Sequence, residues 1–252
     1  MYNDPLISVL MPAYNAEDYI KDAIKSVLAQ TYENWELIIV DDRSTDNTPS
    51  IISEFAETDN RIKKIFNEKN MGAAHSRNIA LNFCCGEYIA LLDSDDIWFP
   101  SKLEHQLKFI KKAEADIVYC SYGIIDSDGI KCRPDFIVEE KVSFHDMLRK
   151  SVMSCSTVMI KRDLLLKYKF REDIYHEDYY LWLQLLKDGH CAVGTSEVLA
   201  QYRRLRGSRS DDKLKSACNR WKIYRDALHL PLWDSIKYMT AYAWAGLKKY
   251  AL

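Results

Sequence analysis

The first half of the chain alternates short apolar runs with amphipathic stretches, and this rhythm limits the fold more than any other feature. Residues 35–40 are nearly all apolar, as in a strand that is buried on both faces. The patterns predict strands at 6–11, 35–40, 62–66, 87–92 and 116–125, and helices at 16–30, 46–57, 71–84 and 101–112. They indicate an α/β, Rossmann-like fold with a mostly parallel twisted sheet and helices on both faces. Ligands of such sheets bind at the carboxyl ends of the strands.

The second half is less regular. Its patterns predict helices at 143–150, 176–187, 211–228 and 232–250, and strands at 155–160 and 198–203. A chain of 252 residues with 48% hydrophobic composition can form one large α/β domain with an appendage, or two small domains. We expect one domain over residues 1–210, in two halves that meet near residue 125, and a C-terminal helical extension over 211–252.

The distribution of charge excludes one class of partner and suggests another. The net charge of −2 argues against general nucleic-acid binding. Residues 201–252 carry twelve Lys and Arg against four Asp and Glu, a net charge of +8. This basic end can contact something anionic, such as a diphosphate or a membrane surface, or it can be a pair of solvated helices.

Cysteine usage and the apolar runs indicate the cell compartment. The seven cysteines are odd in number and include no C-x-x-C pair, which is typical of reduced thiols. Residues 1–10 lack the basic region and long apolar run of a signal peptide. No run reaches the roughly 18 apolar residues of a transmembrane helix. We therefore expect a cytoplasmic protein.

Two acidic clusters directly follow predicted strands. Asp41 and Asp42 can accept hydrogen bonds from the base and ribose of a nucleoside, or they can belong to a polar turn that caps the next helix. The run Asp93-Ser94-Asp95-Asp96 places three carboxylates in four residues, and a divalent cation would relieve their repulsion. An acidic helix-capping turn is the alternative. A calcium EF-hand loop is excluded, because Ile97 and Trp98 occupy positions that need an oxygen ligand and a glycine.

Two further clusters lie in the second half. His176-Glu177-Asp178 begins a predicted helix, where acidic residues offset the helix dipole, and it lacks the H-E-x-x-H pattern of a zinc protease. Residues 202–210 hold four arginines and two serines. Arginine pairs well with phosphate oxygens, although a basic surface loop would have the same composition.

The clusters together resemble glycosyltransferase family 2, which has the GT-A fold. The motifs in family order are Pro12-Ala13-Tyr14-Asn15, Val40-Asp41-Asp42-x-Ser44-Thr45-Asp46-x-Thr48, Asn70-x-Gly72-x-x-x-Ser76-Arg77-Asn78, Asp93-x-Asp95-Asp96, Glu177-Asp178 and Tyr202-Arg203. They span residues 5–210, and Ser76 stands where the family more often has alanine. Within the family the chain is most similar to enzymes of teichuronic-acid, capsular and O-antigen polysaccharide synthesis.

The resemblance implies a role for each matching residue. Residues 1–125 would form the nucleotide-binding half of the GT-A catalytic domain and residues 126–210 the acceptor half. Asp178 would be the catalytic base. Asp95 would be the principal ligand of Mn²⁺ or Mg²⁺, and Asp93 would contact both the metal and the ribose. The other nucleotide-sugar contacts would be Pro12, Ala13, Tyr14, Asn15, Asp41 with Arg77 at the base, Ser94, and, over the diphosphate, Arg203 and Ser208.

The implied reaction is an inverting transfer of a sugar from a nucleotide diphosphate, expected to be UDP, to an acceptor hydroxyl. The acceptor would be a saccharide or a lipid-linked oligosaccharide of the bacterial cell surface. Two other classes fit less well. A nicotinamide-dependent oxidoreductase needs G-x-G-x-x-G where this chain has residues 12–17 without glycine. A non-catalytic sugar-nucleotide binding module does not need both Asp95 and Asp178.

The last predicted helix, at 232–250, carries an apolar stripe formed by Trp233, Ile236, Met239, Tyr242, Ala243 and Leu247. Trp244 lies off this stripe, and Lys237, Lys248 and Lys249 flank it. Such a helix can lie peripherally in the inner face of the cell membrane, with its lysines toward anionic lipid. It can also pack on the catalytic domain or on a second subunit.

Overall fold

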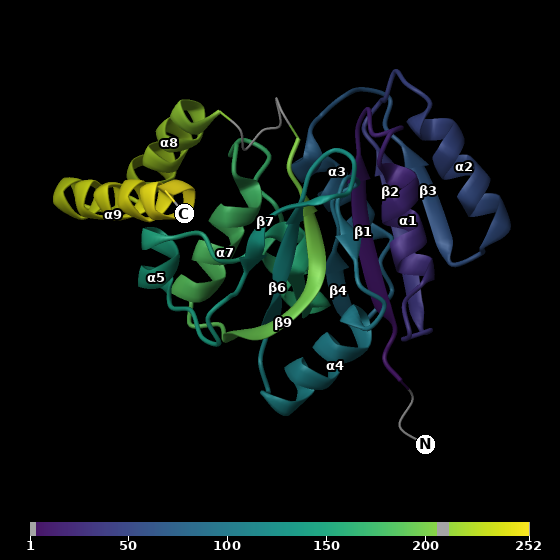
Figure 1. Cartoon of the computed structure of the whole chain (residues 1–252), viewed down its shortest axis with the longest axis horizontal. Coiled ribbons are helices and arrows are strands. Elements are labelled where there is room, and N and C mark those ends of the chain that lie inside the picture. The colour runs from purple at the N-terminus through teal and green to yellow at the C-terminus, as the bar shows by residue number, and fades with distance from the viewer. Residues whose placement is uncertain (1–3, 206–211, 252) are drawn as a thin grey trace.

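The computed structural model describes residues 4–205 and 212–251, with backbone only from 245 onward. Its described strands form one sheet in the order β3-β2-β1-β4-β8-β6-β9-β5, with β7 paired to β6 (Figure 1). The first-half strands β1 (Ile7–Ala13), β2 (Trp35–Asp41), β3 (Ile62–Phe66) and β4 (Tyr88–Leu91) all run parallel. The predicted α/β fold is confirmed. Because Ala13 pairs with Asp41, the loops after β1 and β2 leave the same edge of the sheet.

The helices that follow these strands along the chain cover both faces of the sheet. They are α1 (Ile20–Leu28), α2 (Thr48–Thr58), α3 (Ala73–Asn82) and α4 (Lys102–Lys112). Buried side chains of α1, α2 and α4 join one hydrophobic core, and those of α3 join a second core on the opposite face. Strand residues alternate between the two cores, as the apolar runs predicted: Ile38 and Val40 belong to one core, Leu37 and Ile39 to the other.

The second half adds antiparallel pairings, so the sheet is parallel mainly in its first half. Here β6 (Ile117–Ile125) pairs parallel with β9 (Ala192–Arg203) but antiparallel with β7 (Lys131–Phe136) and β8 (Val158–Lys161). The strand expected at 155–160 starts later, because Cys155–Thr157 forms a 3-10 turn. Three elements escaped prediction: β5 (Ile97–Trp98), β7 and α6 (Arg162–Tyr168). They are short, and β7 is largely exposed and contains a proline, so none carries a clear apolar period.

The C-terminal helices pack beside α5 (Phe144–Arg149) and α7 (Glu177–Lys187), at the far end of the molecule from α2 (Figure 1). The single helix expected at 211–228 is α8 (Lys213–Lys222) followed by the π-helical turn Ile223–Ala227, and α9 spans Leu232–Ala251. Arg220 lies buried between the rings of Tyr179 and Tyr242, 3.9 Å from each ring centroid. Within the described residues, no helix is both long and apolar enough to cross a bilayer.

Candidate active site

The loops after β1 and β2 are joined by hydrogen bonds from side chain to backbone. Ser44 Oγ accepts from the Asn15 N–H at 2.9 Å, and Asn15 Oδ1 accepts from the Thr45 N–H at 2.9 Å. Asn15 has a φ of 45°, a left-handed conformation that asparagine adopts more readily than most residues. Pro12 and Ala13 are buried, whereas Tyr14 is 50% exposed. Of these four predicted nucleotide-site residues, Tyr14 and Asn15 therefore present their side chains to solvent.

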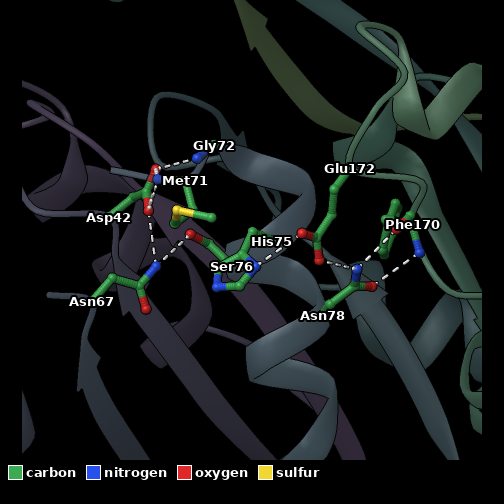
Figure 2. Close-up of polar contacts among 9 residues, drawn as sticks. All are labelled: Asp42, Asn67, Met71, Gly72, His75, Ser76, Asn78, Phe170 and Glu172. Atoms are coloured by element: carbon green, nitrogen blue, oxygen red, sulfur yellow. Dashed lines mark hydrogen bonds and ion pairs between the residues drawn. The ribbon is translucent and has the colours of Figure 1, made fainter. Parts of the chain in front are cut away.

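The adjacent carboxylates Asp41 and Asp42 have different surroundings. Both oxygens of Asp42 accept hydrogen bonds, which come from the backbone N–H groups of Met71 and Gly72 and from Asn67 Nδ2 (Figure 2). Asp42 thereby anchors the start of α3, where Gly72 takes a φ of 91°. Asp41 Oδ2 accepts from the Ser44 N–H, but its buried Oδ1 has no partner among the described residues.

An open polar hollow of about 660 Å³ adjoins Asp41. Its volume lies in the range of ordinary small-molecule sites. Side chains of α2 and of the ends of β2 and β3 line it, among them Arg43, Ser44, Ser50, Glu54, Phe66 and Asn67. Asp41 is among the residues that line the hollow, although its Oδ1, unpaired within the described residues, is itself buried.

The acidic loop after β4 is held from two sides. Ser156 Oγ accepts from the Asp93 N–H at 3.1 Å, and Asp96 Oδ1 accepts from the Arg203 N–H at 2.8 Å. Nothing in the sequence pointed to Ser156, which lies in the 3-10 turn before β8. Burial and the nearby Asp93 charge raise the pKa of Asp95 to about 6, and burial together with Asp95 raises the pKa of Asp96. The buried Asp96 Oδ2 has no partner among the described residues.

Arg77 of α3 brings the two predicted catalytic elements together. Its buried guanidinium donates from Nη2 to Asp93 Oδ1 at 2.6 Å and from Nη1 to Glu177 Oε1 at 2.7 Å. Both terminal nitrogens therefore have carboxylate partners, whereas the sequence had suggested a role for Arg77 at the base. The motif had marked Glu177 as a neighbour of Asp178. No local sequence feature predicts its ion pair with Arg77, because the two residues are 100 positions apart in the chain.

Asp178 is the second residue of α7 and lies next to this bridge. Its Oδ1 accepts from the Tyr179 N–H at 2.7 Å, and its side chain is partly exposed. Burial and the neighbouring Glu177 charge raise the pKa of Asp178 to about 6. A carboxylate with a pKa this close to neutrality suits a general base, because it is ionised at pH 7 and yet more basic than an ordinary aspartate.

Arg203, which the resemblance placed over the diphosphate, is the last residue of β9. Its Nε donates to the Asp95 carbonyl at 2.9 Å and its Nη1 to the carbonyls of Asp126 and Ser127. Its side chain is 3% exposed, so it supports the acidic loop from the interior of the protein. Ser208, the other residue predicted there, lies outside the described residues.

The donor set of this loop fits a magnesium or manganese ion. Asp93 and Asp95 offer hard carboxylate oxygens, and the raised pKa of Asp95 reflects a negative charge that a cation would stabilise. The described part of the chain contains no group of three or more His, Cys, Asp or Glu side chains placed to hold a metal. Two carboxylates with the remaining positions left to substrate phosphates are typical of Mg²⁺ sites.

Solved structures with the same fold have GT-A architecture. TarS of Staphylococcus aureus, solved with UDP-GlcNAc, matches with a TM-score of 0.73 at 20% identity, over 94% of this chain and 71% of that one. The mannosyltransferase PcManGT of Pyrobaculum calidifontis, solved with GDP-Man and Mn²⁺, also matches with a TM-score of 0.73 at 20% identity, over 96% and 70% of the two chains. At this identity the likeness concerns the fold.

Relatives found by sequence have a higher identity to this chain than these structures do. The Escherichia coli UDP-Glc:alpha-D-GlcNAc-diphosphoundecaprenol beta-1,3-glucosyltransferase WfgD is 40% identical over 99% of this chain and 96% of its own length. The putative teichuronic acid biosynthesis glycosyltransferase TuaG of Bacillus subtilis is 38% identical over 97% of both chains. The profile described as Glycosyl transferase family 2 matches residues 8–169. The chain belongs to glycosyltransferase family 2.

Proposed function

We propose that this glycosyltransferase moves a hexose from a UDP-sugar to a hydroxyl of a saccharide or lipid-linked oligosaccharide, with inversion, during synthesis of a bacterial cell-surface polysaccharide. The observation that carries the proposal is the Arg77 bridge, because it joins the acidic loop at Asp93 to the start of α7, where Asp178 lies. The activity named for WfgD, transfer of glucose from UDP-Glc to a lipid diphosphate-linked GlcNAc, supports the substrate class.

The donor would bind across the carboxyl edge of β1, β2 and β4. Asp41 Oδ1, which has no partner among the described residues, would accept a hydrogen bond from the base, beside Tyr14 and Asn15. Asp93 and Asp95 would hold Mn²⁺ or Mg²⁺, which would neutralise charge on the leaving diphosphate. Arg77 and Arg203 would keep this loop in place.

Asp178 would accept the proton of the acceptor hydroxyl as its oxygen attacks the anomeric carbon. The new glycosidic bond forms on one face of the sugar while the bond to the diphosphate oxygen breaks on the other. A single displacement of this kind inverts the anomeric centre, so an α-linked donor gives a β-linked product. WfgD is named as a beta-1,3-glucosyltransferase, and this linkage is consistent with the proposed stereochemistry.

A sugar-transfer assay tests the proposal. The purified protein would be incubated with Mn²⁺, a panel of UDP-hexoses and a GlcNAc-diphosphate lipid, and the products separated by mass. We expect one UDP-sugar to add a single hexose, and the Asp178→Asn protein to form little of this product. Absence of transfer and of donor hydrolysis with every UDP- and GDP-sugar tested would contradict the proposal.

We also propose that a cytoplasmic enzyme of this kind contacts the inner face of the membrane through α9. The predicted stripe divides in the structure: Met239 packs inward, beside the buried Tyr238, which was not part of the stripe, whereas Trp233 and Ile236 are exposed. Trp244, expected off the stripe, is 63% exposed and lies three turns from Trp233 on the same side of the helix. Exposed tryptophans on an amphipathic helix favour the headgroup region of a bilayer.

Sedimentation with vesicles tests this contact. We expect the full chain to sediment with vesicles that contain anionic lipid at low salt, and a variant with Trp233→Ser and Trp244→Ser to remain largely in solution. If the two proteins sediment to the same extent, α9 does not contact lipid through this face.

A further inference from the structure

The segment 170–177 connects α6 to α7 and leads directly into Asp178. Two consecutive residues of α3 hold its two ends. Arg77 donates to Glu177 at the end of the segment, and Asn78 bonds to the backbone of Phe170 at its start. The same α3 arginine also holds Asp93. One short stretch of helix therefore contacts both the acidic loop and the segment that places the proposed base.

Asn78 satisfies both backbone groups of Phe170 with one carboxamide. Its Nδ2 donates to the Phe170 carbonyl at 2.8 Å, and its Oδ1 accepts from the Phe170 N–H at 2.9 Å (Figure 2). Nδ2 also donates to Glu172 Oε1 at 3.1 Å, and Glu172 pairs in turn with His75. Only an amide side chain offers a donor and an acceptor in this arrangement, because a carboxylate cannot donate. Glutamine has the same groups on a chain one methylene longer.

The backbone around Phe170 has a conformation that depends on contacts with neighbouring residues. Lys169, the C-cap residue that follows α6, has a φ of 52°, a left-handed conformation that is uncommon for residues other than glycine. Such a conformation persists where the surrounding contacts fix it, and Asn78 fixes the next peptide along. Phe170 is 3% exposed, and its ring lies 5.4 Å from the Arg77 guanidinium carbon. Holding Phe170 therefore also supports Arg77 from one side.

We propose that Asn78 is a positioning residue for catalysis: by clamping Phe170 it fixes segment 170–177, and with it the place of Asp178 relative to the acidic loop. This inference rests on the proposed function, in which Asp178 is the base. Asn78 does not contact the acidic loop or the hollow beside Asp41 in any described interaction. Its loss should consequently affect the transfer step more than donor binding.

The test compares Asn78→Ala and Asn78→Asp with Asn82→Ala. Asn82 is an exposed asparagine of the same helix whose side chain makes no hydrogen bond within the described residues. Three quantities would be measured: kcat for sugar transfer, the Kd of UDP in the presence of Mn²⁺ by calorimetry, and hydrogen exchange of residues 170–178. Asn78→Asp keeps the size of the side chain and the acceptor for the Phe170 N–H, and it removes the donor to the Phe170 carbonyl and to Glu172.

We expect both Asn78 variants to lower kcat about 10- to 100-fold, since small displacements of a reacting group have effects of this size. The Kd of UDP should stay within about twofold, exchange at 170–178 should become faster, and Asn82→Ala should match the wild type. If hydrogen exchange at residues 170–178 is unchanged in the variants, Asn78 does not fix this segment, whichever substrate the enzyme uses. Unchanged kcat with faster exchange, or an equal loss of kcat and UDP affinity, would overturn the positioning role. If Asp178→Asn keeps wild-type turnover, the proposed base is wrong, a failure that is distinct from these results.

Discussion

The acidic pair after β2 and the acidic run after β4 leave the same edge of the sheet, yet their oxygens have different partners. Asp42 is fully bonded to the start of α3, and it acts as part of the scaffold. In the run after β4, burial raises the pKa of Asp95 and Asp96, and Asp96 Oδ2 has no partner in the described chain. A carboxylate with its hydrogen bonds satisfied stabilises a fold, whereas one that is buried with like charges nearby destabilises it until a cation binds.

The largest effect on activity should come from loss of the proposed base, Asp178, because neither the acidic pair after β2 nor the acidic run after β4 can take its place. Asp178→Asn preserves the shape of the side chain but removes the proton acceptor, so kcat for transfer should fall by about 10²–10⁴. Donor affinity should persist, because the variant leaves both loops intact. Steady-state transfer assays with a parallel UDP titration measure the two quantities. Wild-type turnover would show that the proton goes elsewhere.

The two loops should respond to neutralisation with opposite signs. At pH 7 without metal, Asp42→Asn should lower the free energy of unfolding by about 1–3 kcal/mol, because the N–H groups of Met71 and Gly72 lose a charged acceptor. Asp95→Asn should raise it by up to about 2 kcal/mol. The folded-state pKa of Asp95, about 6, lies above its ordinary value, so the ionised carboxylate destabilises the fold above that pH.

Urea unfolding of both variants at pH 7 and pH 4.5 measures this contrast. The gain in Asp95→Asn should largely vanish at pH 4.5, where the wild-type side chain is protonated in the folded state. A destabilised Asp95→Asn at pH 7 would mean that this carboxylate supports the fold, as Asp42 does.

The pH profile should show a smaller effect. Only ionised Asp178 can accept a proton, and its pKa is raised to about 6, so kcat should fall roughly tenfold per unit as pH drops below 6. Saturating Mn²⁺ and donor keep Asp95 ionised and leave Asp178 as the titrating group. A kcat that stays constant from pH 7 to pH 5 would contradict the assignment.

Sequence patterns predicted the first half of the fold well, because buried parallel strands and amphipathic helices leave local apolar periods. They did not predict β5, β7 or α6, whose pairing depends on distant residues such as Gln201 for Ile97. Motif order pointed to Asp41, Asp95 and Asp178. It could not distinguish Asp41 from Asp42 by surroundings, since that difference arises from Met71 and Gly72 folding back onto one carboxylate.

The contacts of the two arginines were also beyond the sequence. The family resemblance implied that Arg77 would lie at the base and Arg203 over the diphosphate. The structure buries both side chains and pairs them with groups of the acidic loop and its surroundings. Burial of a charged side chain depends on long-range packing, which no local spacing records.

The central claim is that the run after β4, and not the pair after β2, binds the donor through a divalent cation. Calorimetric titration of UDP into the wild type, Asp95→Asn and Asp42→Asn, each with Mn²⁺ and with EDTA, tests it most directly. We predict Mn²⁺-dependent binding in the wild type and in Asp42→Asn, and affinity weakened at least about tenfold in Asp95→Asn with Mn²⁺ present. Equal UDP affinity in wild type and Asp95→Asn with Mn²⁺ present, or a wild-type UDP affinity that EDTA leaves unchanged, would contradict the account.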